Sequence, residues 1–414
     1  MSGTYTGASH DIIYTNTAVT GSQPQVEIKA TQTQSAPNNF DHAGASGDCG
    51  IATGNKAGNG YVFTLNHKAS YLCLIPRTTN EYVKRSKLIR VEIMSDDEIA
   101  GTYNMAADGT LTLASGGSKK ITVTTGSGFA IYNTADDMSK NATYAVVAPG
   151  THTFRIRYWL RNTTDNPKGT IEGTVSKIIT LNCTAGSIHD ITANLNPHDY
   201  DGDHYYMWDA QQQYWYGYEW TRHLSGNTGQ PTLNGNSSSN YAQSNADPRY
   251  YNEAFTYGAD NKATHTSCKD LPNVNEMTWY AAKGEPRWDG DELWTTMGHL
   301  YKGGMWFKKK ANISGFDANK AVDGSDWRTN SNGNNWSVSQ TPPDAADANN
   351  YFYLPALGFC DSGQLNYVGN HGNYWSSSAY PWNSNFAYYL GFYSGNVYVG
   401  YYNRDNGFRA EALQ

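Results

Sequence analysis

Short alternating segments dominate the pattern of hydrophobic and polar positions before residue 197. Apolar residues recur at every second position in several runs, as expected for strands that bury one face. Clusters such as Gly116-Gly117 and Ala148-Pro149-Gly150 separate these runs at short spacing. The pattern predicts an antiparallel, all-β sandwich without helices, with strands at residues 87–93, 110–113, 121–124, 144–147, 151–158, 178–181 and 188–191.

Helical and strand patterns are mixed after residue 197. Asn273 and Glu276 have the spacing of a capping box, and the helix that they begin should run to Lys283 and end at Gly284. Apolar residues at helical spacing predict a second helix over Asp291–Lys302, namely Leu293, Trp294, Met297, Leu300 and Tyr301. A polar loop is expected over residues 329–350, and strands at 305–308, 351–357, 386–393 and 397–402. This half is therefore predicted to be an α+β domain.

The aromatic composition changes at the same point in the chain. Of the 12 tryptophans and 32 tyrosines, 11 and 23 follow residue 197. The segment from Asn194 to Asp203 is rich in Asn, Asp, Pro and Gly, which is typical of a turn-rich junction. We therefore predict two domains, residues 1–197 and 198–414.

The charge balance excludes some classes of function. Lys and Arg number 30 and Asp and Glu 37, so the formal charge is 30 − 37 = −7, which argues against a nucleic-acid binder. No apolar run approaches the roughly 18 residues of a membrane-spanning helix. The first residues, MSGTYTG, show no secretion signal, so we expect a cytoplasmic protein or a mature form whose signal was removed.

No metal or cofactor site is predicted. The five cysteines lie far apart without a CxxC pair, and the eleven histidines form no HExxH motif. The segment Asp199–Asp203 is similar to a calcium loop, but its spacing does not fit and we interpret it as a linker. The carboxylates of Trp288–Glu292 could bind calcium as in lectins, or could open the second helix, which we favour.

Several motifs after residue 200 carry a resemblance to fimbrillin-family (Mfa-like) surface proteins, which are pilins of the type V class in anaerobic gut bacteria. These motifs are Leu271-Pro-Asn-Val-Asn-Glu-Met-Thr-Trp-Tyr280, Lys283-Gly-Glu-Pro-Arg-Trp288 and Gly298-His-Leu-Tyr-Lys-Gly-Gly-Met-Trp306. The chain's end resembles the C-type-lectin-like domain that some members carry, through Tyr351-Phe-Tyr-Leu-Pro-Ala-Leu357, Tyr374-Trp-Ser-Ser-Ser378 and Tyr402-Asn-Arg-Asp-Asn-Gly-Phe-Arg409. The resemblance implies a pilin-like or immunoglobulin-like sandwich, followed by a ligand-binding lectin-like domain.

The lectin-like fold is related to formylglycine-generating enzymes and to ligand-binding proteins that retroelements diversify. The enzymes work through a reactive cysteine pair, and Cys360 has no cysteine nearby, so the resemblance supports no enzymatic activity. Retroelement diversification of adenines cannot produce Lys, Glu or Met codons from AAC codons. Residues 359–406 contain none of these three residues, which makes this segment a candidate variable region and Cys360 a candidate variable surface position.

We place the ligand-binding site on strands 386–393 and 397–402 and their loops. Tyr, Asn, Ser and Gly are typical of adaptable binding surfaces. Tyr388, Leu390, Phe392, Val397 and Val399 should face the core, if the predicted strands alternate. The ligand should meet the outward set, which assumes that alternation ends near Gly400: Tyr380, Asn383, Asn385, Tyr389, Gly391, Tyr393, Asn396, Gly400, Tyr401, Asn403 and Asp405.

The resulting hypothesis is a cell-surface adhesin, at a pilus tip, whose ligand is a protein or glycan of a host or bacterial surface. A pilin subunit would join the first domain by donor-strand exchange. The alternative is a carbohydrate-binding or receptor-binding module without a pilus role, which a phage could encode. An enzyme is the third and least favoured hypothesis.

Overall fold

The computed structural model describes residues 4–18, 23–222, 224, 229–232, 235–254 and 261–414. Contacts divide the chain into two compact units. The first consists of Met1–Thr164, Thr174–Asn196 and Asp344–Ala348, and the second of Asp165–Gly173, Pro197–Pro343 and Asn349–Gln414. That residues 1–197 and 198–414 are separate domains stays a prediction, and each unit is described by itself.

The first unit is built of β-sheets, as its alternating pattern predicts. One sheet has the order β1 (Ser9–Tyr14), β4 (Gly50–Ala57) and β5 (Gly60–Val62), with β6 (Asn66–His67) also on β4. A second has the order β10 (Leu111–Ser118), β9 (Ala100–Met105) and β2 (Gln25–Ile28). A third set of paired strands has the order β14 (Ile171–Cys183), β13 (Gly150–Asn162), β8 (Lys87–Ser95), β11 (Lys120–Ala130) and β3 (Thr31–Thr33). A further sheet has the order β12 (Thr143–Val147), β7 (Ser70–Arg77) and β15 (Ile188–Asn194).

Each strand expected in this half overlaps an observed strand, but two details of the prediction are wrong. Strand β15 pairs with β7 in parallel, and β11 pairs with β3 in parallel, so the sheets are not purely antiparallel. Helices are also present, each one turn long: α1 (Ala43–Ser46), α2 (Glu81–Lys84) and α3 (Met138–Asn141). Asn80 and Asp137 cap the last two, so these helices rest on local capping and not on an apolar stripe.

The second unit combines sheets with one longer helix. Strands β18 (Arg287–Thr296), β19 (His299–Lys308) and β21 (Tyr351–Pro355) pair in sequence, with β16 (His198–Asp199) beside β18. A six-stranded sheet has the order β17 (Tyr205–Tyr206), β27 (Phe408–Arg409), β24 (Gly372–Ala379), β25 (Phe386–Tyr393), β26 (Asn396–Asn403) and β20 (Asn334–Ser337). Strands β22 (Phe359–Asp361) and β23 (Gln364–Asn366) form a small hairpin, and short 3-10 helices lie at Glu219–Thr221, Lys310–Asn312 and Ala348–Asn350.

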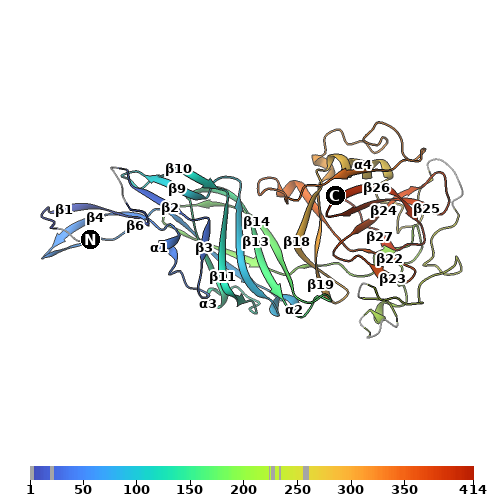
Figure 1. Cartoon of the computed structure of the whole chain (residues 1–414), viewed down its shortest axis with the longest axis horizontal. Coiled ribbons are helices and arrows are strands. Elements are labelled where there is room, and N and C mark those ends of the chain that lie inside the picture. Colours follow the sequence, from blue (N-terminus) through green and yellow to red (C-terminus); the bar gives the residue numbers. More distant parts are fainter. Residues whose placement is uncertain (1–3, 19–22, 223, 225–228, 233–234, 255–260) are drawn as a thin grey trace. The chain divides into compact units, whose positions relative to one another are not determined.

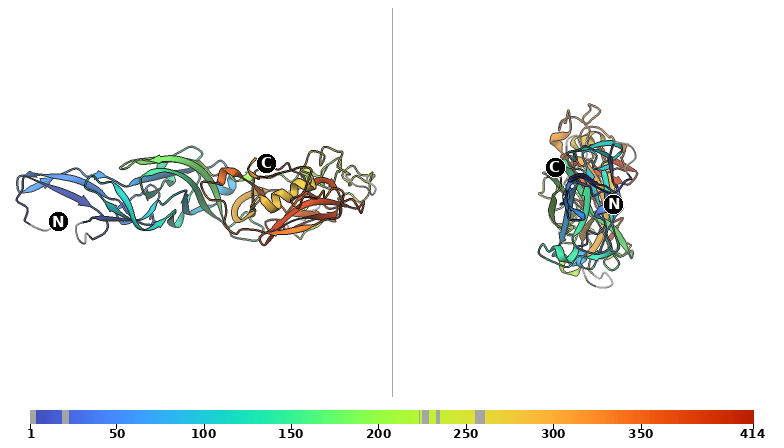
Figure 2. Two further views of the ribbon diagram at one scale, coloured as in Figure 1. Left: turned by 90° about the horizontal axis from the view of Figure 1, so that it is seen from above. Right: turned by 90° about the vertical axis from the view of Figure 1, so that its left-hand side faces the viewer.

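Helix α4 (Val274–Lys283) confirms the predicted capping box. Asn273 accepts a hydrogen bond from the Glu276 backbone N–H, and Glu276 accepts one from the Asn273 backbone N–H. The helix ends at Gly284, as predicted. It lies against strands β24, β25 and β26, so it covers one face of the sheet that carries the predicted site (Figure 1, and the left view of Figure 2).

The second predicted helix, over Asp291–Lys302, is wrong. This segment belongs to the hairpin of β18 and β19, in which Trp294 pairs with Tyr301 and their rings stack 5.4 Å apart. The turn residues Met297 and Gly298 both have positive φ, which is the backbone of a type I′ hairpin turn. Leu293–Thr296 are buried on both faces, and the adjacent apolar residues Leu293 and Trp294 lack the period of two that identifies a strand.

The polar loop predicted over residues 329–350 also contains regular structure. Strand β20 lies within it and pairs with β26, where Trp336 is the register partner of Val397. The Asp289–Glu292 carboxylates lie in strand β18, so they do not open a helix.

Candidate functional site

The hairpin of β25 and β26 carries most of the predicted site residues. Its register runs from Phe386 opposite Asn403 to Tyr393 opposite Asn396, so the loop is Ser394-Gly395. In such a pair, residues directly opposite each other share one face of the sheet. Even-numbered residues of β25 therefore share one face with odd-numbered residues of β26. Odd-numbered residues of β25 share the other face with even-numbered residues of β26.

The face toward α4 is the core face, as predicted. Tyr388, Leu390, Phe392, Val397 and Val399 are all buried. They belong to one apolar cluster with residues of α4, among others Val274, Met277 and Tyr280. The expectation that these five residues would be buried is confirmed.

The opposite face is also largely buried, which contradicts the prediction for two of its residues. Tyr389 is only 8% exposed and Gly391 is buried. Tyr389 belongs to a second apolar cluster that includes Trp208, Trp375 and Phe408. Strand β25 is therefore packed from both sides, and neither residue can be a ligand contact on an open face.

The remaining predicted residues do not gather on one face. Tyr393, Asn396 and Gly400 share the face of Tyr389, whereas Tyr401 and Asn403 lie on the α4 side, where the Tyr401 ring stacks on the buried Tyr380 at 3.9 Å. The register continues to the end of β26, but the alternation of burial ends at Gly400 as assumed, because Tyr401, Tyr402 and Asn403 are all exposed. The others lie in the turns beside the hairpin, half-buried or exposed: Asn383, Asn385 and Asp405.

A different set of rings lies along this side of the hairpin and beside its loop, and we call this surface the aromatic face. It consists of residues that lie within the candidate variable region 359–406: Phe359, Tyr367, His371, Tyr393, Tyr398 and Tyr402. Successive ring centroids lie 5.7 Å (Phe359 to Tyr367), 4.7 Å (Tyr367 to His371) and 5.4 Å (His371 to Tyr393) apart. Tyr367, Tyr393 and Tyr402 are exposed. Of the six residues, only Tyr393 was predicted, although strict alternation across the two-residue loop would have indicated Tyr398 and Tyr402.

Backbone geometry holds these rings in place. Tyr367 has φ 60°, an uncommon conformation for a residue with a side chain, and its carbonyl accepts hydrogen bonds from the N–H groups of Asn370 and His371. The Tyr398 ring lies across Gly391, because a Cβ atom there would come within 2.3 Å of the ring. A glycine is therefore required at position 391 for Tyr398 to lie flat on the strand.

The electrostatics of the aromatic face are weakly acidic. Residues 359–406 contain three charged side chains, of which Asp361 and Asp405 are exposed and Arg404 is buried. Partial desolvation of the carboxyl group, and then the nearby Asp361 charge, raises the pKa of Asp405. Partial burial lowers the pKa of His371, so this ring stacks on its neighbours as a neutral imidazole at neutral pH.

Cys360 is not a surface position, which corrects the prediction. Its side chain is fully buried beside Tyr205, Tyr214 and Trp215. Burial raises the pKa of its thiol to about 12, so the thiolate that nucleophilic chemistry needs is not formed at neutral pH. All five cysteines are buried and unbonded to one another.

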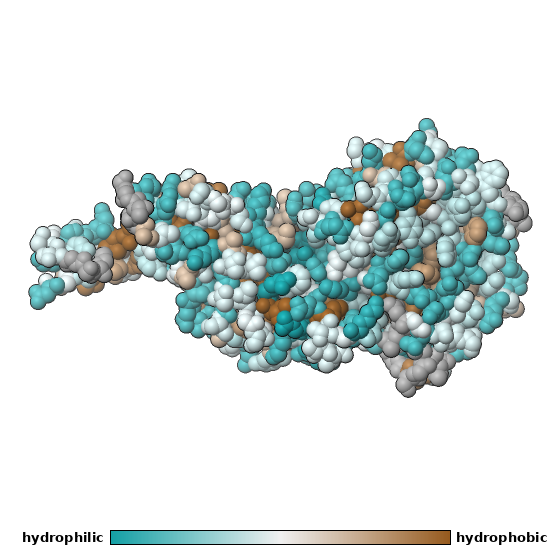
Figure 3. Space-filling view, in the orientation of Figure 1, coloured by the Kyte–Doolittle hydropathy of each residue, from teal (hydrophilic) through white to brown (hydrophobic). Residues whose placement is uncertain are grey.

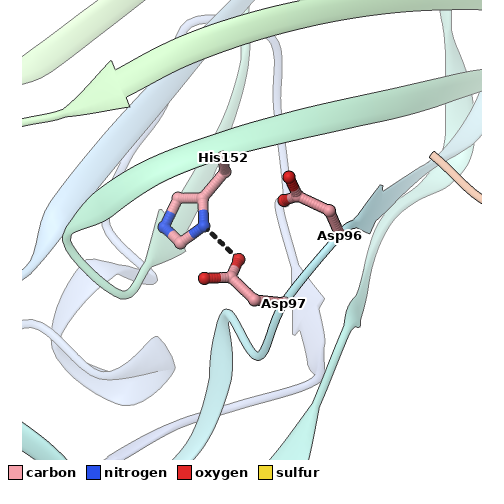
Figure 4. Close-up of side chains that lie close together, drawn as sticks. All are labelled: Asp96, Asp97 and His152. Atoms are coloured by element: carbon pink, nitrogen blue, oxygen red, sulfur yellow. Dashed lines mark hydrogen bonds and ion pairs between the residues drawn. The ribbon is translucent and has the colours of Figure 1, made fainter. Parts of the chain in front are cut away.

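Two groups of side chains among the described residues have ligand atoms close enough for a metal ion. In the first, Asp96, Asp97 and His152, a hydrogen bond joins the imidazole Nδ1 to Asp97 (Figure 4). The Nε2 atom is hydrogen-bonded to the Ala148 carbonyl. Both ring nitrogens thus lie at hydrogen-bonding distance from protein oxygens, so neither is left for a metal ion. The second group, Asp201, Asp203 and His204, is exposed, and the Nδ1 atom of His204 lies 2.7 Å from the Oδ1 atom of Asp203. Neither group offers a reason to assign a metal.

The visible surface is mostly hydrophilic, with apolar residues in small separate patches (Figure 3). Among the described helices, none combines the length and apolarity that crossing a membrane requires.

Comparisons with known proteins give distant likenesses only. No family model matches the chain, and no curated protein matches it. A solved structure described as a candidate cell adhesion protein from Bacteroides ovatus is similar with a TM-score of 0.28 and 14% identity, over 45% of this chain and 62% of that one. Structures with the same description from Bacteroides fragilis (TM-score 0.21, 11% identity, 35% and 51% covered) and Bacteroides uniformis (TM-score 0.21, 16% identity, 42% and 72% covered) are also similar. The match spans less than two thirds of the Bacteroides ovatus chain.

Proposed function

We propose that this chain is a cell-surface adhesin that binds its ligand with the aromatic face of the second unit. The observation that carries the proposal is the exposure of Tyr367, Tyr393 and Tyr402 on a face whose strand β25 is packed from both sides. Tyrosine offers a large contact area at small entropic cost. A rigid support also avoids the cost of ordering a mobile loop on binding.

The finer parts of this proposal come from the resemblance of the sequence to fimbrillin-family proteins. These parts are the location at the cell surface, the C-type-lectin-like character of residues 198–414 and the position at a pilus tip. Helix α4 against a sheet, followed by a β-rich C-terminus, is compatible with them. A variable surface diversified by a retroelement is a further part of the proposal.

Bead adhesion tests the main proposal. Beads coated with the purified chain are mixed with epithelial cells and with bacterial cells, and bound beads are counted. The test variant replaces Tyr367, Tyr393 and Tyr402 by Ala. A matched control replaces three exposed tyrosines outside the aromatic face by Ala: Tyr5, Tyr132 and Tyr216.

We expect the wild type and the control to bind and the test variant to lose most binding. The proposal is contradicted if wild-type beads bind neither cell type. It is equally contradicted if the test variant binds as well as the control.

We also propose that a pilin subunit joins the first unit by β-strand addition. Strand β1 pairs with β4 on one side and, within the described residues, has no strand on the other. It exposes Ile13 and Tyr14, beside a cavity of about 450 Å³ that Ile12 and Ile51 help to line. Such an edge is a template for a strand from another chain.

Charge on this edge should block assembly. Ile13→Lys should prevent incorporation of the chain into pili isolated from producing cells, as judged by immunogold microscopy, whereas Val62→Lys on the exposed strand β5 should not. Normal incorporation of Ile13→Lys would refute the assembly proposal. Adhesion without any incorporation of the wild type would favour a ligand-binding module that has no pilus role.

A further inference from the structure

Two side-chain amides lie at the aromatic face with one polar atom each that lacks a partner. Asn373 on β24 is 3% exposed, and its Nδ2 meets no acceptor among the described residues. The Oδ1 of Asn396 is likewise buried and meets no donor there. Register places Asn373 opposite Gly391, and Asn396 opposite Tyr393, on the same face of the sheet.

An unpartnered donor and an unpartnered acceptor on one face select for a ligand that supplies both functions. Leaving such groups unpaired in the interior is unfavourable, so a ligand that satisfies them gains affinity. A hydroxyl group can both donate and accept a hydrogen bond. A ligand rich in hydroxyl groups is therefore the best chemical match to this pair of amides.

Access to Asn373 depends on the ring beside it. The Tyr398 ring lies across Gly391, which has no side chain of its own, and Tyr398 is half-buried. Side chains at a surface change rotamer rapidly. Binding to Asn373 therefore requires this ring to rotate away from Gly391.

The charges and the apolar groups of the face narrow the ligand class further. The exposed charges are both negative, at Asp361 and Asp405, which disfavours sialylated and sulfated ligands. Aromatic rings with a few fixed polar groups are typical of small-ligand sites.

We propose that the ligand of the aromatic face is an uncharged glycan, one sugar of which bonds through its hydroxyl groups to Asn373 Nδ2 and Asn396 Oδ1. The Tyr367 and Tyr393 side chains border this sugar. The inference rests on the proposed adhesin function and deepens it by naming the ligand class.

A printed array of neutral, sialylated and sulfated oligosaccharides tests the inference with the full chain as probe. We expect binding to a subset of the neutral oligosaccharides. Asn373→Leu and Asn396→Ala should each weaken binding to the same spots at least tenfold, and Tyr216→Ala should leave it unchanged. Because Asn373→Leu replaces an unpartnered amide by an apolar group of similar size, its melting temperature should equal or exceed that of the wild type.

The outcomes separate this inference from the proposed function. Binding only to sialylated or sulfated spots overturns the inference, as does unchanged affinity in both Asn variants. If Asn373→Leu does not fold, Asn396→Ala decides alone. Adhesion of beads to cells that survives periodate oxidation of the cell surface but is lost after trypsin treatment indicates a protein ligand, which overturns the glycan and leaves the adhesin.

Discussion

Two tyrosines on one face of strand β25 should respond to alanine substitution in opposite ways. Tyr389 and Tyr393 lie four residues apart, so their side chains point to the same side of the sheet. Tyr389 is 8% exposed, and its ring centroid is 4.9 Å from that of Phe408 and 6.2 Å from that of Trp375. Tyr393 is 38% exposed and contacts His371. We expect Tyr389→Ala to destabilise the fold, and Tyr393→Ala to reduce ligand binding.

The magnitudes follow from burial. Truncation of a buried aromatic side chain to Ala costs about 3–5 kcal/mol, and the small exposed part of Tyr389 places it near about 3 kcal/mol. For a unit of this size each kcal/mol shifts the melting temperature by about 2–4 °C, so Tyr389→Ala should melt about 6–12 °C lower. Tyr393→Ala should cost less than about 1 kcal/mol and shift the melting temperature by at most about 4 °C.

Tryptophan fluorescence is the appropriate assay, because 11 of the 12 tryptophans follow residue 197 and report mainly on the second unit. Thermal and urea unfolding of the two variants are compared with the wild type, together with bead adhesion. Equal melting shifts in the two variants would refute the two-sided packing of β25. A larger shift for Tyr393→Ala would have the same meaning.

Three further predictions concern single residues of the second unit. Asn273→Ala removes the cap of α4 and should lower the free energy of unfolding by about 1 kcal/mol in urea titrations; an unchanged midpoint would contradict the capping role. Cys360→Ser buries a hydroxyl group and should lower the free energy of unfolding by about 1–3 kcal/mol. In the wild type, the Cys360 thiol should react with a thiol reagent at pH 8 only after denaturant is added. Hydrogen bonding to Arg328 lowers the pKa of Asp326 to about 2 in the folded protein. In the unfolded chain the pKa of an Asp is about 4, so the ionised Asp326 stabilises the fold fully above that pH, and this stabilisation is lost as the pH falls toward 2. Asp326→Asn should therefore have a lower free energy of unfolding than the wild type at pH 6, and the difference should disappear by pH 2. A difference that stays constant with pH would show that the charge of Asp326 is not its cause.

The elements that the sequence predicts correctly are those whose signal is local. The capping box at Asn273 and Glu276 fixes the start of α4, because both hydrogen bonds form between neighbours in the chain. The alternating run at residues 87–93 likewise lies within strand β8. By contrast, Leu293–Thr296 are buried on both faces through distant contacts, and such a run carries no period to distinguish a strand from a helix.

The candidate site was predictable only on the side toward α4. The five inward residues have an apolar pattern of their own, so alternation identifies them. Tyr389 was assigned to the ligand because nothing in its neighbourhood shows that Trp208 and Phe408, which are far away in the sequence, cover it. Phe359 and Tyr367 belong to a separate hairpin, and only the fold brings them to the face of β25.

The two-sided packing of β25 makes the β25–β26 hairpin a suitable scaffold for engineered binding proteins. The side chains at positions 367, 393 and 396 belong to neither apolar cluster, so a library at these positions would change the surface and leave the packing of β25 intact. Selection from such a library would compare side chains on one fixed backbone. Positions 388–392 should be left out, because many variants with changes there would not fold.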